Sequence, residues 1–170
     1  MKKILMILMA VLLLPAMMSA KGSVFAYIID NDGPVTNIRN APKGKVVAKL
    51  PTNQALVVEL LSVKGEWFKI DKVVEQYGDD EKEIVLKGSK TGYWIHNSLL
   101  SFTIAGDPKG CLRVKPSKEA KAVRTADGAD LTLRPISLQG EWVKVVTTDG
   151  KYSGWIHRDK ICSNPLTTCP

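Results

Sequence analysis

The feature that most constrains this 170-residue chain is a short pattern that occurs twice. Gly65-Glu66-Trp67 is followed by Gly92-Tyr93-Trp94-Ile95-His96, and Gly140-Glu141-Trp142 is followed by Gly154-Trp155-Ile156-His157. All 4 tryptophans and both histidines of the chain lie in these two copies. A frame repeated in this way predicts two copies of one small domain. Because paired small modules more often bind than catalyse, the pattern favours a binding protein.

The first twenty residues have the order of a secretory signal peptide. Met1-Lys2-Lys3 is a short basic start, Ile4 to Leu14 is an unbroken apolar run, and Ser19-Ala20 gives a small-residue end. The apolar run is too short to cross about 30 Å of hydrocarbon as a helix. We therefore expect an exported protein, periplasmic or extracellular, with no stable membrane insertion after the signal is cleaved.

The charge of the chain is mildly basic. The formal net charge is +7, and removal of Lys2 and Lys3 with the signal lowers it to +5. In the sequence this excess is spread out, without a lysine and arginine cluster interleaved with aromatic residues. A solvated basic surface is favoured over a nucleic-acid site, so no nucleic-acid partner is expected. A polyanionic wall polymer or an acidic glycan stays open as a ligand.

Three cysteines, Cys111, Cys162 and Cys169, make disulfide pairing plausible in an exported chain. The preferred pair is Cys162 with Cys169, which closes a short loop around Pro165 and leaves Cys111 as a small core residue. A bond between Cys111 and Cys162 remains an alternative. The chain lacks paired Cys-x-x-Cys or His-x-x-x-His spacing, so neither a metal site nor a cofactor is expected.

The rest of the chain reads as short strands separated by turn residues. Such runs are Val46–Ala48, Ala55–Leu61 and Trp67–Ile70 in the first copy, and Lys121–Val123, Leu131–Leu133 and Trp142–Val146 in the second. Short valine-rich strands divided by Gly, Pro and Asp predict an all-β barrel or sandwich.

The two copies align apart from one insertion. Asn37 to Pro42 matches Cys111 to Pro116, but the two tryptophans are 27 residues apart in the first copy (67 to 94) and 13 in the second (142 to 155). The extra residues of the first copy lie between Val73 and Ser89, where we expect a hairpin that extends outward. This insert is the most acidic stretch of the chain, with Glu75, Asp79, Asp80, Glu81 and Glu83. In the second copy, Thr148-Asp149-Gly150-Lys151 predicts a tight hairpin at the same place.

These observations give a division of the chain. We expect a signal peptide at 1–20, a first module at 21–102 with its insert near 73–89, a second module at 103–162, and a tail at 163–170. Each module is near the lower size limit for a core of its own, so packing between the two would stabilise both.

The repeated residues resemble bacterial SH3-like domains. The matching motifs of the first copy are Asp30-Asn31-Asp32-Gly33, Asn37-Ile38-Arg39-Asn40-Ala41-Pro42, the hairpin from Gly65 to Ile70, and the closing Gly92 to His96. The second copy departs where Cys111 replaces the asparagine, and the first where Tyr93 is an extra residue between Gly92 and Trp94. The resemblance implies two tandem small SH3-like β-barrels that bind rather than catalyse. Such domains commonly accompany cell-wall hydrolases and are thought to contact peptidoglycan or its peptides.

Strand alternation separates the side chains of each hairpin onto two faces. Phe68 and Ile70 share the aliphatic face, which should point to the core, while Trp67 and Lys69 share the other. Trp142 to Val145 repeats this split. A tryptophan beside a lysine on an open face suits stacking on a sugar or a peptide backbone. The alternative is that each tryptophan covers its own barrel or fills the contact between the modules. The candidate binding residues are Arg39, Trp67, Lys69, Tyr93, Trp142 and Lys144.

The other repeated residues have structural interpretations. For Trp94 and Trp155 we expect packing in the core or hairpin. For Arg39 and Arg113 we expect hydrogen bonds to turn carbonyls, with ligand recognition as the second reading.

The two histidines, His96 and His157, occupy equivalent positions. We expect them to have the same structural role in each copy, such as a hydrogen bond to the backbone of a turn. A cysteine hydrolase would need Cys111 or Cys162 to meet one of them, and no known signature surrounds either cysteine. Asp30 to Gly33 looks like the start of a calcium loop but is better read as a turn, because the rest of the loop is missing.

The sequence therefore predicts an exported, non-enzymatic protein that binds cell-envelope material, either peptidoglycan or its peptides. The first alternative is a protein–protein interaction module that regulates a separate envelope enzyme through the acidic insert. A small cysteine hydrolase is the second. If a single barrel binds, the first copy is the better candidate.

Overall fold

The structure is a computed structural model that describes residues 23–78, 80–105, 111–123, 132–164 and 166. The expected signal peptide and Cys169 lie outside the described residues. The described regular elements are β-strands and two short 3-10 turns, so the all-β prediction is confirmed. In this part of the chain, no helix has the length and apolar character needed to cross a membrane.

The strands of the first half form a large antiparallel sheet. They are β1 (Val24–Ile28), β2 (Val35–Arg39), β3 (Val46–Pro51), β4 (Leu56–Lys64), β5 (Trp67–Tyr77), β6 (Asp80–Ile84), β7 (Tyr93–His96) and β8 (Leu100–Ser101). The order in the sheet is β3-β2-β7-β5-β4-β1-β8, with β6 paired to β5. A 3-10 turn, η1 (Asn97–Leu99), separates β7 from β8.

The second half is smaller. Its sheet has the order β10-β11-β12 and is built from β10 (Leu133–Gln139), β11 (Trp142–Thr147) and β12 (Ser153–His157). After the 3-10 turn η2 (Arg158–Lys160), β13 (Ile161–Cys162) pairs with β9 (Thr103–Ile104). The expected closed barrels are not seen, because no sheet of the described residues is closed by a pairing of its end strands.

Side-chain alternation explains why these segments are strands. In β11 the residues alternate between half-buried and buried, and Val143 and Val145 are fully enclosed. Phe68 and Ile70 occupy the same inward positions at the start of β5. A period of two with an apolar inner face is the pattern that a half-buried strand requires.

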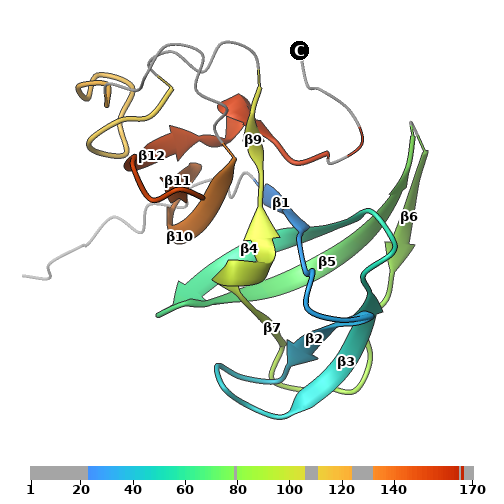
Figure 1. Cartoon of the computed structure of the whole chain (residues 1–170). Helices are drawn as coiled ribbons and strands as arrows, with labels where there is room; N and C mark the ends of the chain where they lie inside the picture. Colours follow the sequence, from blue (N-terminus) through green and yellow to red (C-terminus); the bar gives the residue numbers. More distant parts are fainter. Residues whose placement is uncertain (1–22, 79, 106–110, 124–131, 165, 167–170) are drawn as a thin grey trace, which may run out of the picture.

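The insertion predicted in the first copy is a hairpin of β5 and β6. The two strands pair from Val73 with Ile84 to Tyr77 with Asp80, and Figure 1 shows the hairpin extending away from the rest of the sheet. In the second copy a tight turn replaces it. There the Gly150 N–H donates to the Thr147 carbonyl, and Gly150 has a φ of 73°, which glycine adopts without strain.

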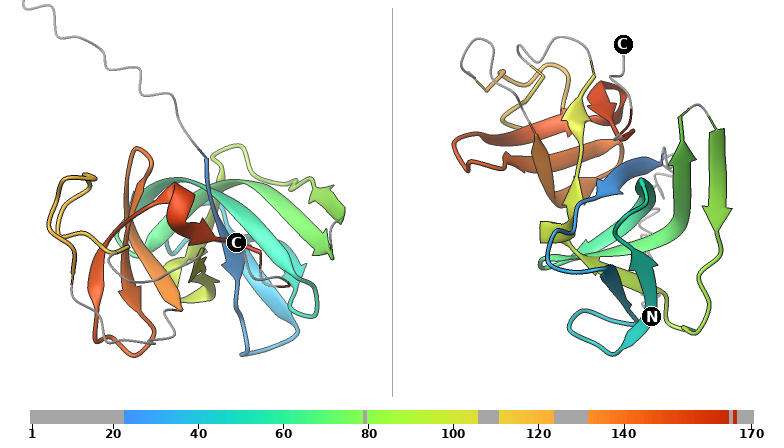
Figure 2. Two further views of the ribbon diagram at one scale, coloured as in Figure 1. Left: turned by 90° about the horizontal axis from the view of Figure 1, so that it is seen from above. Right: turned by 45° about the vertical axis from the view of Figure 1, so that its right-hand side comes forward.

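The two halves share one hydrophobic core. Phe102, between β8 and β9, is completely buried and exchanges two backbone hydrogen bonds with Leu133 at the start of β10, of 3.1 and 2.8 Å. The Ser101 hydroxyl donates to the same Leu133 carbonyl. Buried residues of both sheets form a continuous cluster around this junction. Figure 2 shows the small sheet packed beside the large one, so each half completes the core of the other.

Candidate functional site

The first Gly-Glu-Trp and Trp-Ile-His frame places four side chains on one face of the large sheet. Across the β5–β7 pair, Trp67 is opposite His96 and Lys69 is opposite Trp94. Because directly opposed residues in antiparallel strands point to the same side, all four share a face. The alternate residues Phe68 and Ile95 are fully buried, so this face points away from the core.

Arg39 completes this surface from the neighbouring strand, because β2 pairs with β7 through Arg39 and Trp94. We call the set Arg39, Trp67, Lys69, Trp94 and His96 the first outer face. All five side chains are half-buried, which leaves part of each in contact with solvent.

The second frame repeats this arrangement residue by residue. Trp142 is opposite His157, and Lys144 is opposite Trp155, across the β11–β12 pair. Arg113 forms an isolated bridge to Trp155, as Arg39 does to Trp94. Arg113, Trp142, Lys144, Trp155 and His157 therefore form the second outer face.

Of the two places expected for Trp94 and Trp155, the core and the hairpin, the structure excludes the core. Both are half-buried and lie on the outer faces, because each is opposite a lysine of the neighbouring strand. Sequence alternation within β5 and β11 placed Trp67 and Trp142 correctly on the solvent side. The side of Trp94 and Trp155 depends on how β7 and β12 pair with those strands, which the sequence did not give.

Tyr93 is not an extra residue in the first copy. It pairs with Ile70 as Gly154 pairs with Val145, so the two residues are equivalent and the frames have the same length here. This register puts Tyr93 on the side of Ile70, where it packs against the core. The structure thus brings five of the six predicted binding residues onto the outer faces, in two groups, and leaves Tyr93 apart from them.

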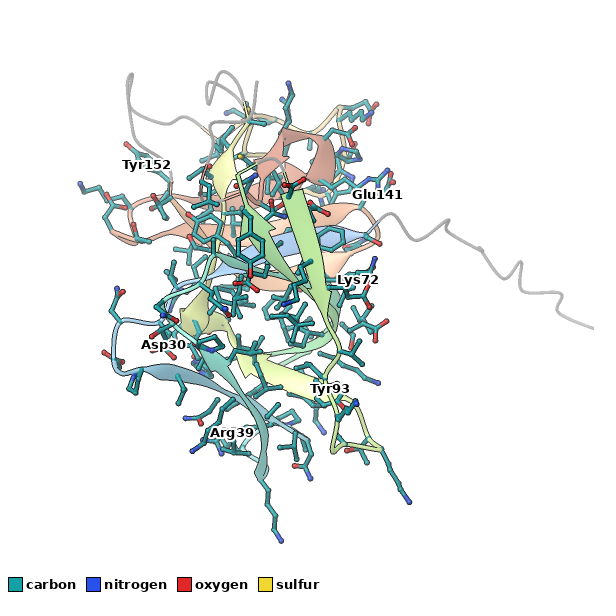
Figure 3. The ribbon with its side chains drawn as sticks, turned by 90° about the vertical axis from the view of Figure 1, so that its right-hand side faces the viewer. Asp30, Arg39, Lys72, Tyr93, Glu141 and Tyr152 are labelled. Carbon is teal, nitrogen blue, oxygen red and sulfur yellow. The ribbon has the colours of Figure 1, made fainter. Side chains whose placement is uncertain are left out.

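Arg39 has both a structural bond and a place on the outer face. Its guanidinium donates to the Gly44 carbonyl over 2.7 Å and lies 5.8 Å from the centre of the Trp67 ring. Arg113 donates to the Ala120 carbonyl over 3.3 Å. The prediction of bonds to turn carbonyls is confirmed for both arginines. Figure 3 shows Arg39 at one end of the molecule, with Glu141 of the second half towards the other end.

Lys69 lies across a glycine. A Cβ atom placed on Gly92 would come within 2.4 Å of Lys69 Cε, so the lysine chain runs over the bare backbone of Gly92. Gly92 also has a φ of 100°, which disfavours any other residue. Because Gly92 has no side chain, the aliphatic stem of Lys69 lies directly against its backbone.

The histidines cap the two 3-10 turns, as the sequence predicted. His96 Nδ1 accepts from the Ser98 N–H over 3.3 Å, and His157 Nδ1 accepts from the Asp159 N–H over 3.4 Å. The backbone angles at the two histidines agree closely, with φ of −77° and −78°. A side-chain acceptor at this position satisfies a backbone donor that the short turn leaves unpaired.

The other ring nitrogen of each histidine faces a glutamate of its own hairpin. His96 Nε2 lies 3.5 Å from Glu66 Oε2, and His157 Nε2 lies 3.4 Å from Glu141 Oε2. His157 also has Asp159 beside Nδ1, at 3.2 Å. In each copy, Nδ1 therefore caps the following turn and Nε2 faces a carboxylate of the hairpin.

Cys162 is buried at the end of the chain's described β-structure and is disulfide-bonded. Its predicted partner, Cys169, lies outside the described residues, so the pairing stays a prediction. Cys111 is partly buried and packs against the core next to Leu112.

The acidic insert differs from the surface that its composition suggested. Glu75 is 3% exposed, and its hydrogen bond with Tyr77 raises the pKa of the Tyr77 phenol. Asp80, Glu81 and Glu83 are exposed, and Glu83 lies 3.4 Å from Lys72. Glu75 therefore does not belong to the exposed acidic surface that the sequence suggested, and Asp79 lies outside the described residues.

The Asp30-Asn31-Asp32-Gly33 segment is a turn. Asp30 accepts hydrogen bonds from the Asp32 N–H and from the Thr36 hydroxyl, at 3.2 and 3.0 Å. Among the described residues, no three His, Cys, Asp or Glu side chains gather as a metal site would require.

Four exposed lysines were missed by the sequence analysis. Lys43 and Lys45 lie in the turn between β2 and β3, and Lys87 and Lys90 lie in the loop between β6 and β7. The structure joins these segments, because the Thr91 hydroxyl donates to the Asn40 carbonyl over 2.8 Å. We call these four lysines the basic rim. A signal was present in the sequence, since residues 33–58 and 84–105 contain no Asp or Glu.

A surface groove lies elsewhere in the described structure. It has a volume of about 320 Å³ and lies between β4 and the β10–β11 hairpin, where Glu59, Leu60 and Leu138 contribute to its walls. None of the residues that line it belongs to either outer face. We therefore place the candidate site on the sheet surface.

Comparison with known proteins does not assign a family. No family model matches the chain, and no curated protein matches it. Among solved structures, NlpC1 from Trichomonas vaginalis is similar at 13% identity and a TM-score of 0.29, over 90% of this chain and 50% of that one. The chain thus spans about half the length of that protein. A likeness at this level identifies neither a fold nor an activity.

Proposed function

We propose that this chain is an exported, non-catalytic protein whose two SH3-like modules bind cell-envelope material, either peptidoglycan or its peptides. The proposal draws on the sequence resemblance to bacterial SH3-like domains and on the signal-like leader. It also draws on the way in which the two frames repeat each other in three dimensions.

One observation carries the proposal: each half displays the same partly exposed set of two tryptophans, a lysine, an arginine and a histidine on the outside of its sheet. Aromatic rings beside cationic donors suit polymers that alternate sugar rings with polar peptide. Lys69 and Lys144 lie outside the core, and each arginine binds a turn carbonyl in addition to lying on its face. Duplication also favours binding, because two weak sites on one chain gain avidity when both engage the same polymer.

The cysteine-hydrolase alternative receives less support. Cys162 is disulfide-bonded and so has no thiol to offer. Both ring nitrogens of His96 and His157 already face a backbone N–H or a carboxylate. A general base for a thiol would need one of those nitrogens to be available.

The test is co-sedimentation of the purified protein with purified sacculi. We expect the wild type to pellet, and Trp67→Ala and Trp94→Ala each to lower the pelleted fraction several-fold. Tyr77→Ala is the matched control, because Tyr77 is an exposed aromatic residue (51%) on the insert and away from both outer faces. Absence of wild-type pelleting would sink the proposal, and so would equal losses in the control and the tryptophan variants.

The contribution of each module can be separated in the same assay. Trp142→Ala changes only the second outer face, and a double variant with Trp67→Ala changes both. If the two faces act together, the double variant should lose more than the product of the single losses, because avidity disappears. If Trp142→Ala has no effect, the first module alone binds.

The alternative of a protein-interaction module rests on the exposed carboxylates of the β5–β6 hairpin. Deletion of residues 75–83 is a poor test, because Glu75 is buried and lies within β5. A cleaner variant combines Asp80→Asn, Glu81→Gln and Glu83→Gln, which removes the charge and leaves the backbone. Loss of a co-purifying envelope enzyme in this variant, with sacculus binding unchanged, would favour the alternative.

A further inference from the structure

Charges in the first half of the molecule are segregated into two regions. Residues 33–58 contain Arg39, Lys43, Lys45 and Lys49, residues 84–105 contain Lys87 and Lys90, and neither segment contains a carboxylate side chain. These two segments lie side by side, whereas Figure 1 shows the acidic β5–β6 hairpin directed towards the other end of the molecule. The cationic side chains of these two carboxylate-free segments therefore lie at one end of the large sheet.

The loop that carries Lys87 and Lys90 is held by its own hydrogen bonds. The Ser89 hydroxyl donates to the Gly92 carbonyl over 2.7 Å, and the Thr91 N–H donates to the Ser89 hydroxyl. A Cβ atom on Gly88 would lie 3.3 Å from the Val47 carbonyl, so the loop also packs closely on β3. The two lysines are thus presented from a fixed backbone, which lowers the ordering cost of binding.

Lys43 is in an unusual conformation for its type. Its φ of 59° makes it the one residue other than glycine with a positive φ among the described residues. Glycine or asparagine is favoured at such positions, and a lysine there costs backbone energy. Strain of this kind concentrates at functional positions, where the side chain is needed.

The basic rim is continuous with the first outer face. Arg39 precedes the turn that contains Lys43 and Lys45, and its guanidinium donates a hydrogen bond to the Gly44 carbonyl within that turn. Lys69 runs across Gly92, next to the loop of Lys90. Cationic groups therefore extend from the aromatic centre of the face to the edge of the sheet. Two exposed carboxylates lie near this surface: Glu66, beside His96, and Asp71, two residues along β5 from Lys69.

We infer that the basic rim and the first outer face together bind a flexible, linear polymer that carries anionic groups at short intervals. This inference rests on the proposed function, in that it names the chemical class of envelope ligand. Lysines outnumber arginines in the surface, and a lysine acts as a point charge without the planar geometry of a bidentate site. Such a surface binds according to the charge density of the ligand and does not require a fixed ligand geometry. Phosphate and carboxylate polymers both carry closely spaced negative charges, so both have the required chemistry.

A single-stranded nucleic acid is the rival ligand, because it also combines negative charge with stacking groups. The predicted export of the protein argues against it, because nucleic acid is not an expected component of the cell envelope. The salt dependence of binding is shared by both ligand classes, so a direct comparison of the two polymers is part of the test.

The test measures binding of linear inorganic polyphosphate to the purified protein by tryptophan fluorescence, at several salt concentrations. Affinity should fall about 10- to 100-fold between 50 and 200 mM salt if several charges are neutralised. A variant with Lys43→Gln, Lys45→Gln, Lys87→Gln and Lys90→Gln should lose at least tenfold in affinity. All four lysines are exposed, so the fold should survive, and this is checked by circular dichroism.

The matched control removes the same charge from the second module, with Lys115→Gln, Lys118→Gln, Lys121→Gln and Lys160→Gln. These four residues are also exposed. The control should change the affinity less than threefold. Equal losses in both quadruple variants would mean that only net charge matters, and would overturn the inference.

Two further probes identify the ligand class. If poly-L-glutamate binds as tightly as polyphosphate and loses the same affinity in the rim variant, the site accepts anionic polymers of either chemistry. If polyphosphate binds and poly-L-glutamate does not, the ligand is a phosphate polymer. A single-stranded oligonucleotide that binds more tightly than polyphosphate of equal charge would overturn the inference in favour of a nucleic-acid site. Absence of polyphosphate and poly-L-glutamate binding would overturn it as well.

Failure of this inference is distinguishable from failure of the proposed function. If the wild type and the rim variant co-sediment equally with sacculi while neither anionic polymer binds, the proposed function is supported and the anionic ligand class is rejected. If polyphosphate binds through the rim but sacculi do not pellet the wild type, the rim is a polyanion site and the wall-binding proposal falls.

Discussion

The indole of Trp67 meets the imidazole of His96 edge-on, with ring centres 5.1 Å apart and planes at 76°. Trp142 and His157 repeat the contact at 5.0 Å and 71°. In both copies the same histidine caps a 3-10 turn, and the Gly-Glu-Trp glutamate accepts a backbone N–H of that turn through its carbonyl. The repeated sequence therefore encodes a repeated hairpin end, which we call the hairpin corner. There, the tryptophan, histidine and glutamate contacts fasten the end of the hairpin to the following 3-10 turn.

Removing either histidine should destabilise the fold through loss of this corner. We expect His96→Ala and His157→Ala each to lower the free energy of unfolding by about 0.5–2 kcal/mol, as for other lost caps. His157→Ala should cost more, because its side chain is 12% exposed against 29% for His96. Urea denaturation measures both. Asparagine at either position supplies an acceptor for the turn and should recover part of the loss; if it recovers nothing, the cap is not the cause.

Gly154→Ala should be destabilising because the chain crosses close over Gly154. A Cβ atom there would lie 3.1 Å from the Arg113 carbonyl, Leu112 Cβ and Val123 Cγ2. Overpacking of this kind costs about 1–3 kcal/mol. The measurement is thermal or urea denaturation. Gln139→Ala, at an exposed position of β10, serves as the control, and an equal effect of both substitutions would contradict the packing argument.

The Asp149 turn should make stability depend on pH in the acid range. Hydrogen bonds from the Thr147 hydroxyl and the Lys151 N–H, together with the Lys151 ammonium, lower the pKa of Asp149 from 3.8 to about 2. A carboxyl whose pKa is lowered by folding stabilises the native state above its unfolded pKa, and this contribution disappears as pH falls through the folded pKa.

Asp149→Asn should therefore be less stable than the wild type at pH 7, and the two should converge between about pH 4 and pH 2. Urea denaturation at pH 7, 4 and 2.5 gives the difference at each point. A gap that is constant across this range would show that the carboxylate charge does not contribute.

Trp94→Ala should cost much less stability than Phe68→Ala, because the two residues lie on opposite sides of the same sheet. Phe68 is fully buried, and its replacement is expected to cost about 3–5 kcal/mol. Trp94 is half-exposed, so its loss should cost about half of that or less. Denaturation of the two variants decides the matter, and similar costs would mean that Trp94 behaves as a core residue.

Much of the local structure could be predicted from single strands. Alternation correctly assigned Phe68 to the core and Trp67 to the outside, and the length difference between the copies correctly located the β5–β6 hairpin. Errors arose where a residue's side depends on a partner strand. The sequence predicts that Trp94, two residues after Gly92, packs in the core or hairpin. Its outward direction is fixed only by its pairing with Lys69.

By itself, the sequence determined that this protein is all-β and that it contains one frame twice, because strand period, turn residues and repeated motifs are local properties. The tertiary structure decided which residues share a surface. It joined the halves through Phe102 and Leu133 and placed Glu75 inside. It also brought Lys43 and Lys45 beside Lys87 and Lys90, more than forty residues away in the sequence. The physical reason is that strand pairing is non-local: a two-fold alternation fixes the two faces of each strand, and only the register between strands decides which faces meet.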